Sequence, residues 1–173
     1  MARTFQNIRL FHDMTVIENV KAACGKDLTY GLLDAAFRTP RFWKEEKAVT
    51  EKAMDLLAIC HLEDKAEVLA SSLPYGQQRK LEIARALATD MKLLLLDEPA
   101  AGMNPTETAE LLECINTIRD RFGIAILLIE HDMSLVMNVC ERIQVIDYGQ
   151  TIASGLPAEI AANPKVIAAY LGQ

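Results

Sequence analysis

Residues 93–99 read Leu-Leu-Leu-Leu-Asp-Glu-Pro, and this stretch decides the fold. Four consecutive leucines between polar neighbours suit a strand of a parallel sheet that is buried on both faces. The run ends in two adjacent carboxylates, Asp97 and Glu98, and Pro99 then prevents the strand from continuing. Because ligands of open α/β sheets bind at the carboxyl ends of the strands, this end is the first candidate for a functional site.

Two carboxylates in this place suggest a particular chemistry. An acidic residue at a strand end can hold Mg²⁺, usually through the waters of the ion. A second carboxylate beside it can orient a water molecule for attack on a phosphate. A plainer interpretation, a strand that ends in a solvated acidic turn, is the better one for an Asp-Glu pair taken alone, so the choice depends on the other motifs.

Strands and helices alternate on both sides of this stretch. Asn104-Pro105 suits a helix start and Gly123 a helix end, which predicts a helix up to Phe122. Residues 124–129 read as a second buried strand. Further segments follow the same alternation: helices over 76–89, 133–140, 157–163 and 164–171, and strands over 142–147 and 150–153. This pattern predicts an α/β fold with a parallel sheet flanked by helices.

The first part of the chain has a different character. Residues 14–24 and 44–60 show apolar positions at helical spacing, and Thr39-Pro40 breaks the chain between them. We therefore expect an α-helical lobe over residues 1–72 and the α/β part over residues 73–173.

Composition excludes several classes of protein. The 173 residues carry a formal net charge of −6, which argues against a nucleic-acid binder that works by bulk positive charge. No apolar run approaches the roughly 20 residues of a membrane helix. The four cysteines form no C-x-x-C pair, so we expect reduced thiols in a cytosolic protein and no metal site built from them.

A second motif lies just before the helix that starts near residue 76. Residues 73–77 read Leu-Pro-Tyr-Gly-Gln. A glycine at a helix start lets a phosphate approach backbone N–H groups, and the helix dipole favours the anion. Taken alone, the segment is an ordinary loop-to-helix junction; its position about twenty residues before Asp97 is what adds weight to the functional interpretation.

Four segments together resemble those of ATP-binding-cassette (ABC) ATPases. Residues 73–77, 93–99 and 129–132 resemble the signature motif, the Walker B motif and the switch-histidine segment, and residues 3–6 resemble the segment with the Q-loop glutamine. Their order and spacing are those of the family. The resemblance implies a partial P-loop NTPase: residues 1–72 as the Q-loop and helical subdomain, and residues 73–173 as the C-terminal part of a RecA-like ATPase core.

The resemblance implies roles for the hydrolytic residues. Asp97 would help to hold Mg²⁺, and Gln6 would reach Mg²⁺ through water or reach the attacking water. Glu98 would orient or deprotonate that water. His131 would contact the γ-phosphate, although a histidine after a strand, taken alone, is more often structural or exposed.

The cofactors implied are ATP and Mg²⁺, in composite sites made by two cassettes arranged head to tail. Leu73, Tyr75, Gly76 and Gln77 of the signature segment would face the ATP held by the second subunit. Residues 100–104 lie where the family has its D-loop, which contacts the other subunit of the dimer. Asn104, the last of them, is expected to be a nucleotide-binding residue.

The exact sequence over residues 2–11, 75–87 and 97–105 resembles that of the ATP-binding subunit of bacterial high-affinity branched-chain amino acid importers. That resemblance implies a second ATPase subunit in a homo- or heterodimer, membrane permease subunits and, indirectly, a periplasmic binding protein, with no nucleic acid. It also implies a peripheral location on the cytoplasmic face of the bacterial inner membrane. Trp43 is either a contact with a coupling helix of the permease or part of the lobe core.

The sequence departs from the family in two ways. Pro74 and Tyr75 replace the Ser and first Gly of the commonest signature, and Asn104 replaces an Asp. More importantly, no G-x-x-x-x-G-K-[ST] segment is present; the nearest Gly-Lys, at residue 25, is followed by Asp27. We therefore expect an N-terminally truncated cassette without ATPase activity of its own, and with apolar surface left exposed where strands are missing.

Two other interpretations remain open. The first is a soluble ABC ATPase, or one for lipopolysaccharide export, and the second is a non-enzymatic remnant that competes for the dimer or the membrane partner. The DNA upstream of Met1 and co-purification with a permease would distinguish them.

Overall fold

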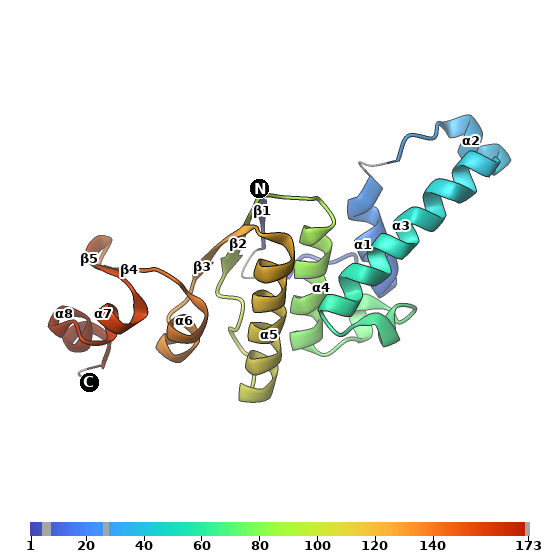
Figure 1. Cartoon of the computed structure of the whole chain (residues 1–173). Helices are drawn as coiled ribbons and strands as arrows, with labels where there is room; N and C mark the ends of the chain where they lie inside the picture. The colour runs from blue at the N-terminus through green and yellow to red at the C-terminus, as the bar shows by residue number, and fades with distance from the viewer. Residues whose placement is uncertain (5–7, 26–27, 172–173) are drawn as a thin grey trace. The chain divides into compact units, whose positions relative to one another are not determined.

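The structure of the chain is a computed structural model that describes residues 1–4, 8–25 and 28–171. It forms two compact units, residues 1–127 and 128–173, and the division falls within a strand. Each unit is described by itself. Helices and strands alternate over residues 75–147, which confirms the alternation predicted there from the sequence (Figure 1).

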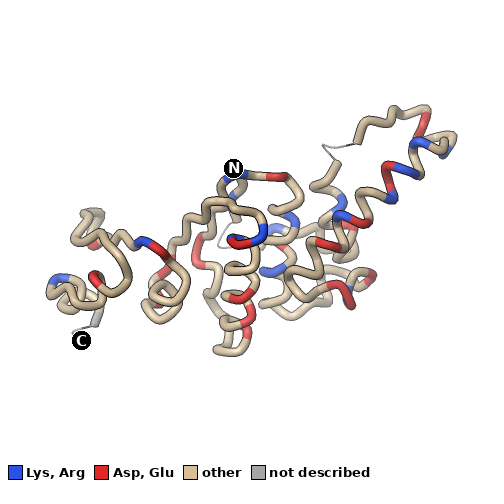
Figure 2. The backbone as a smooth tube through the Cα atoms, viewed as in Figure 1, with Lys and Arg blue, Asp and Glu red and all other residues tan. Residues whose placement is uncertain are grey.

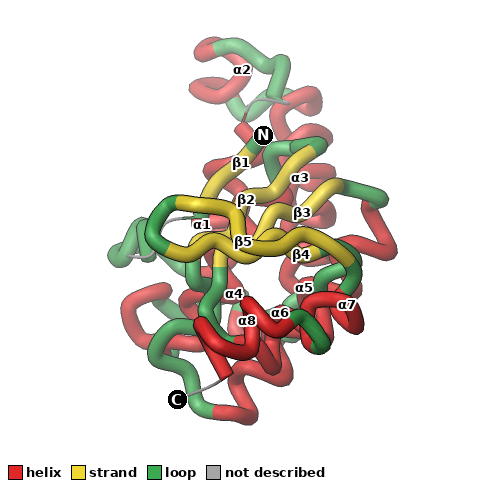
Figure 3. Tube along the Cα trace, turned by 90° about the vertical axis from the view of Figure 1, so that its left-hand side faces the viewer, coloured by secondary structure: helices red, strands yellow, loops and turns green. Residues whose placement is uncertain are grey.

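Three strands form the sheet that carries the acidic pair. β1 (Ala2–Arg3), β2 (Leu93–Asp97) and β3 (Ala125–Ile129) lie in the order β1-β2-β3 (Figure 3). β1 runs parallel to β2, with Ala2 opposite Leu94. The Thr4 amide extends the pairing by donating to the Leu95 carbonyl at 2.9 Å. The parallel pairing predicted for the acidic strand is thus confirmed.

Two helices accompany this sheet, α4 (Tyr75–Leu87) and α5 (Pro105–Phe122), and α4 packs against both α5 and β1. On β2, Leu94 and Leu96 are fully buried, whereas Leu93 and Leu95 are only half-buried. Because alternate residues of a strand point to opposite faces, one face of the sheet is well covered and the other only partly.

β3 corrects one expectation. The sequence predicts a buried strand over residues 124–129, and a strand is present, but Leu127 and Ile129 are 56% and 55% exposed. The apolar run formed a strand as predicted, but the described part of the chain supplies too little structure to cover it.

The helical lobe is built from α1 (Val16–Cys24) and α3 (Pro40–Ile59), which pack against each other. Val16, Val20 and Leu57 are completely buried there. α3 starts four residues before the predicted Lys44, because the Thr39 hydroxyl caps it and Pro40 fits the first helical position. Three smaller elements complete the lobe: α2 (Leu32–Phe37), which has no buried residue, and the 3₁₀ turns η2 (Glu63–Lys65) and η3 (Ala70–Ser72).

The second unit is small. α6 (Met133–Val139) precedes an antiparallel pair, β4 (Ile143–Asp147) and β5 (Gln150–Gly155), which confirms the predicted hairpin. Gly149, with φ of +78°, makes the turn. α7 (Pro157–Ala161), α8 (Pro164–Val166) and the π-helical turn η4 (Ile167–Leu171) follow. The core of this unit comprises Val136, Ile143, Val145, Ile160 and Val166.

Candidate functional site

The acidic pair lies at the carboxyl end of β2, as the sequence predicts. Asp97 is the last residue of the strand, and its carboxylate accepts a hydrogen bond from Arg3 Nη2 at 2.9 Å. The ion pair is partly open to solvent, with 26% of the Asp97 side chain and 52% of the Arg3 side chain exposed. Glu98 has φ of +41°, in the left-handed region that a non-glycine residue rarely adopts, so the chain turns sharply before Pro99.

The residue 73–77 segment forms the start of α4. Leu73 is buried, while Tyr75, the first residue of the helix, is 43% exposed. The Pro74 carbonyl accepts the Gln77 and Gln78 amides, each at 3.0 Å. Gln77 Oε1 also accepts a hydrogen bond from Lys65 Nζ at 2.9 Å, so its side chain is tied to η2. Lys65 was not singled out from the sequence, because nothing local marks this contact.

Gly76 lies against the N-terminus of α5. A Cβ atom at Gly76 would come within 3.0 Å of the Glu107 carboxyl carbon. Glu107 forms a capping box with Asn104: Asn104 Oδ1 accepts the Glu107 amide at 3.0 Å, and Glu107 Oε2 accepts the Asn104 amide at 3.1 Å. The structure therefore brings two predicted site residues, Gly76 and Asn104, to the same acid. Glu107 was not predicted from the sequence, although the Asn-x-x-Glu pattern at residues 104–107 is typical of a capping box.

A buried ion pair fixes α4 from within. Arg79 Nη1 donates to Glu82 Oε2 at 2.8 Å, and both side chains are almost completely buried. Glu82 Oε1 also accepts the Arg9 amide at 3.3 Å, which links α4 to the chain that follows Gln6. Gln6 itself lies outside the described residues. Removing one partner of such a buried pair usually costs several kcal/mol, about 3–5, so this pair stabilises the helix that carries the signature segment.

His131 belongs to the second unit, and its position is described within that unit alone. Its side chain is 74% exposed, and its amide donates to Glu130 Oε2 at 3.2 Å. The next residue, Asp132, caps α6 by accepting the Ser134 and Leu135 amides at 2.9 and 3.2 Å. The cap fixes the backbone beside His131 and leaves the imidazole open to solvent.

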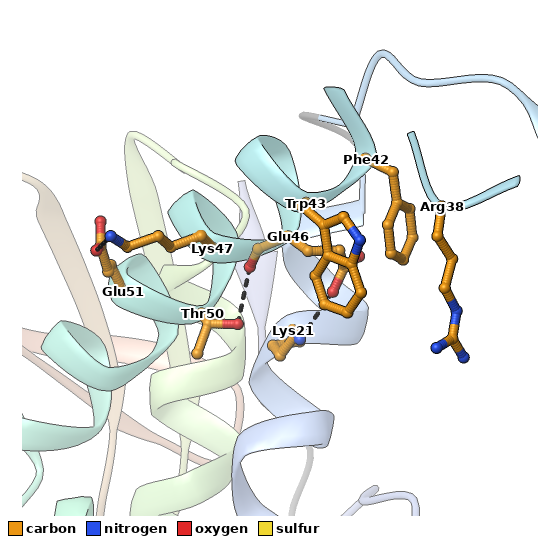
Figure 4. Close-up of a pocket in the computed structure, with 8 residues that line it drawn as sticks. All are labelled: Lys21, Arg38, Phe42, Trp43, Glu46, Lys47, Thr50 and Glu51. Atoms are coloured by element: carbon orange, nitrogen blue, oxygen red, sulfur yellow. Dashed lines mark hydrogen bonds and ion pairs between the residues drawn. The ribbon is translucent and has the colours of Figure 1, made fainter. Parts of the chain in front are cut away.

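A surface pocket of about 720 Å³ lies on the helical lobe, where α1 and α3 meet (Figure 4). Phe42 and Trp43 give it an aromatic wall with ring centroids 5.4 Å apart, and Trp43 is 57% exposed. Lys21 and Glu46, which also line the pocket, form an ion pair at 2.9 Å. None of the residues predicted for the ATP site lines this pocket. Trp43 is therefore not a core residue of the lobe, which settles one of the alternatives left by the sequence.

Charge on the lobe is mixed. Figure 2 shows Lys and Arg interleaved with Asp and Glu along α3, including the i,i+4 pairs Arg41–Glu45 and Lys47–Glu51. The carboxylate of Glu45 accepts the Thr29 hydroxyl and amide, both at 2.7 Å, and these bonds lower the pKa of Glu45 to about 2. In the part of the chain that the structure describes, no helix is long and apolar enough to span a bilayer.

The carboxylate at the end of β2 suits a metal ion that is also bound by the phosphates of a substrate. No group of three or more His, Cys, Asp or Glu side chains gathers at one place among residues 1–4, 8–25 and 28–171. Mg²⁺ needs no such cage, because it is commonly bound by one or two carboxylates together with waters and substrate phosphates. A single strand-end carboxylate such as Asp97 fits that mode of binding.

The fold and the arrangement of these motifs define an ABC ATPase. The family profile described as ABC transporter matches residues 1–101, and the profile described as branched-chain amino acid ATP-binding cassette transporter matches residues 150–173. The ADP conformation of MJ1267, an ATP-binding cassette of an ABC transporter, aligns with 99% of this chain and 68% of its own, at 32% identity and a TM-score of 0.74.

Two relatives place the chain more finely. The high-affinity branched-chain amino acid transport ATP-binding protein LivG of Salmonella typhimurium is 47% identical over all 173 residues, which span 68% of its length. BraF of Pseudomonas aeruginosa, with the same description, is 46% identical over the same span. The chain belongs to the ABC transporter ATPase family, in the branch of LivG and BraF. The α/β cassette fold expected from the sequence is thereby confirmed.

Proposed function

We propose that this chain is the greater part of the ATP-binding subunit of an importer for branched-chain amino acids. The observation that carries the proposal is the 47% identity to LivG along the whole chain. The acidic pair at the end of β2 supports it, because a site for a nucleotide and its metal is expected at that edge of a parallel sheet.

Hydrolysis in this proposal depends on four side chains and Mg²⁺. Asp97 and, through water, Gln6 would hold the ion, which would supply positive charge to the phosphates of the nucleotide. Glu98 orients or deprotonates the attacking water. The positive φ of Glu98 sets the direction in which its side chain leaves the backbone. His131 contacts the γ-phosphate, and its exposed imidazole supports this role.

The signature segment would act on ATP held by a second cassette. Leu73 is buried, and Tyr75, Gly76 and Gln77 would present the start of α4 to the nucleotide. The positive end of that helix favours a phosphate. Asn104, which caps α5 beside Gly76, completes the group of nucleotide-side residues. A homo- or heterodimer is therefore part of the proposal.

We also propose that the 173 residues alone do not hydrolyse ATP. A glycine-rich loop with Lys and Ser/Thr normally supplies the backbone N–H groups and the lysine that hold the β- and γ-phosphates. The 173 residues contain no such segment. Most of the groups that would bind the phosphates are therefore missing from them, although the groups proposed to act on the phosphate are present.

The lobe would provide the contact with the permease. Support comes from the pocket beside Trp43, whose aromatic wall and paired charges suit an amphipathic segment of a membrane subunit. A peripheral location on the cytoplasmic face of the inner membrane and an indirect dependence on a periplasmic binding protein follow from such a contact. Functionally, residues 1–72 would form the Q-loop and helical subdomain and residues 73–173 the ATPase core, a boundary different from that of the two compact units.

One experiment tests the proposed function directly. The part of Escherichia coli LivG that lies outside the match is joined to this chain, and ATP hydrolysis is measured with Mg²⁺. We expect turnover that Glu98→Gln lowers by about 10²-fold or more and that the control Glu113→Gln leaves unchanged, since Glu113 is an exposed residue of α5. Turnover that survives Glu98→Gln would refute the role of Glu98.

The partner is tested separately. The chain is co-expressed with branched-chain amino acid permease subunits and purified through them. Trp43→Ala should reduce co-purification, whereas Tyr148→Ala, a fully exposed aromatic residue of the second unit, should not. Equal recovery of both variants would remove the pocket from the proposed interface.

A further inference from the structure

Two cysteines meet in the interior of the first unit. Cys60 is the C-terminal cap residue of α3 in the helical lobe, and Cys114 lies within α5. Both are completely buried. Their sulfur atoms are 2.9 Å apart, and one thiol donates a hydrogen bond to the other. The proposed hydrolysis of ATP uses neither residue, so the contact calls for its own explanation.

Burial alone does not distinguish this pair, because free cysteine is among the most buried residue types. Cys24 is equally buried in α1, and Cys140 is partly buried in the second unit. The distance between the two sulfur atoms is the distinguishing feature. A disulfide joins its sulfurs at about 2.05 Å, so those of Cys60 and Cys114 need to approach by about 0.9 Å to reach bonding distance.

The backbone beside Cys60 suits such a movement. Cys60 follows the last residue of α3, and His61 has φ of +54°, so the chain leaves the helix in a sharp turn. Residues at helix ends are held less firmly than those in the interior of a helix. Cys114 has a buried apolar residue on either side of its turn of α5 and is held in place. The end of α3 is therefore the part that we expect to shift.

The surroundings of the pair bear on its reactivity. The hydrogen bond with Cys114, followed by burial, raises the pKa of Cys60, and the positive charge of Lys80 opposes this rise. Lys80 is itself nearly buried and forms an ion pair with Glu110 of α5 at 2.8 Å. Because the thiolate is the form that reacts, we expect oxidation to begin when the end of α3 opens locally.

We propose that Cys60 and Cys114 are a peroxide-sensitive dithiol that closes to a disulfide and joins α3 of the helical lobe to α5. The oxidant is hydrogen peroxide or an organic hydroperoxide. One thiolate sulfur attacks the peroxide and becomes a sulfenic acid, and the O–O bond breaks to release hydroxide or alkoxide. The second thiol then attacks that sulfur, the S–O bond breaks, and water leaves as the S–S bond forms. With hydrogen peroxide, the two thiols lose two electrons and two protons, and the peroxide becomes two waters.

The closed form has a mechanical consequence. The bond would close a loop of residues 60–114, which includes the signature segment and the acidic pair at the end of β2. Closing a long loop removes conformations from the unfolded chain, so the oxidised protein should be the more stable one. It would also limit movement between the helical lobe and α5.

Peptide mass spectrometry of the purified 173-residue chain tests the proposal. The reduced protein is treated with hydrogen peroxide in native buffer, catalase removes the excess, and the remaining thiols are blocked with iodoacetamide in urea. We expect a cross-link between the peptides that contain Cys60 and Cys114, which dithiothreitol separates. The melting temperature of the oxidised chain should rise by about 5 °C or more and fall again on reduction.

Alanine variants locate the bond. Cys60→Ala and Cys114→Ala should each lose the cross-link and the rise in melting temperature, whereas Cys140→Ala should keep both. Each variant is compared with and without peroxide, which separates the effect of the bond from that of the void left by alanine and from methionine oxidation. If a variant fails to fold, the peptide map of the unchanged chain still decides.

Three results would overturn the proposal. The first is oxidation of Cys140 while Cys60 and Cys114 stay as thiols or become sulfinic acids. The second is a bond from either residue to another cysteine or to a second copy of the chain. The third is a Cys60–Cys114 bond that forms only in urea, or that leaves the melting temperature unchanged or lowers it. None of these results depends on ATP hydrolysis, so this proposal and the proposed function can fail independently.

Discussion

Arg3 Nη2 lies 2.9 Å from Asp97 Oδ2, so a guanidinium occupies one oxygen of the carboxylate proposed to hold Mg²⁺. The two residues are 94 positions apart and meet because β1 and β2 pair in parallel. The ion pair links strand pairing to the candidate site, and its exposure determines how much it contributes to stability.

Arg3→Gln should lower the free energy of unfolding by less than about 1 kcal/mol, because exposed ion pairs contribute little. Half of the Arg3 side chain is open to solvent. Urea unfolding of the variant and of Arg3→Lys measures the change. A loss of several kcal/mol would show that the pair behaves as a buried one, contrary to the structure.

Gly76→Ala should destabilise the chain by about 1 kcal/mol, because the new methyl group displaces the Glu107 carboxyl group from its capping box. A double-mutant cycle checks this cause. In the Glu107→Ala background the obstacle is gone, and Gly76→Ala should then be neutral or slightly stabilising, since alanine favours a helix. Equal effects in both backgrounds would exclude the contact.

Stability should fall at acid pH in part through Glu45. Hydrogen bonds from Thr29 lower its pKa from 4.5 to about 2, so the folded state binds the proton less readily than the unfolded state. The resulting stabilisation is complete above pH 4.5 and is lost as the pH falls toward 2. Urea midpoints across this range should depend less on pH in Glu45→Gln than in the parent or in Glu51→Gln.

NMR titration of the Glu45 carboxyl carbon measures the same quantity directly. A midpoint near pH 4.5 in the folded protein would show that the Thr29 hydrogen bonds are absent in solution.

The thiols of Cys60 and Cys114 lie 2.9 Å apart, where the end of α3 meets α5, and both residues are fully buried. The hydrogen bond with Cys114, together with burial, raises the pKa of Cys60 well above that of an ordinary thiol. Because the thiolate is the reactive form, iodoacetamide should label Cys60 in the native protein only as fast as the structure opens. Peptide mass spectrometry with and without urea checks this, and rapid native labelling would contradict it.

The sequence predicted best those features that are local. Asn104-Pro105 and Gly123 fixed both ends of α5, because caps and turns depend on neighbouring residues. The same reasoning placed the start of α3 too late, since Thr39-Pro40 served as a cap and a first turn where a break was expected.

Contacts between distant residues could not be predicted. The Arg3–Asp97 pair and the approach of Glu107 to Gly76 depend on how strands and helices pack, which one sequence does not reveal. The burial of β3 was predicted from its apolar run, but burial requires partners, and the described chain leaves Leu127 and Ile129 exposed. The roles proposed for Gln6, Glu98 and His131 remain predictions that rest on their places in the motifs.

We propose that the 173 residues include groups that act on the phosphate of ATP but not the glycine-rich loop that would hold it. The most direct measurement is ATP hydrolysis by the purified 173-residue chain with Mg²⁺, compared with its Glu98→Gln variant. We predict the same background rate for both proteins. Clear turnover by the chain alone, abolished by Glu98→Gln, would contradict it.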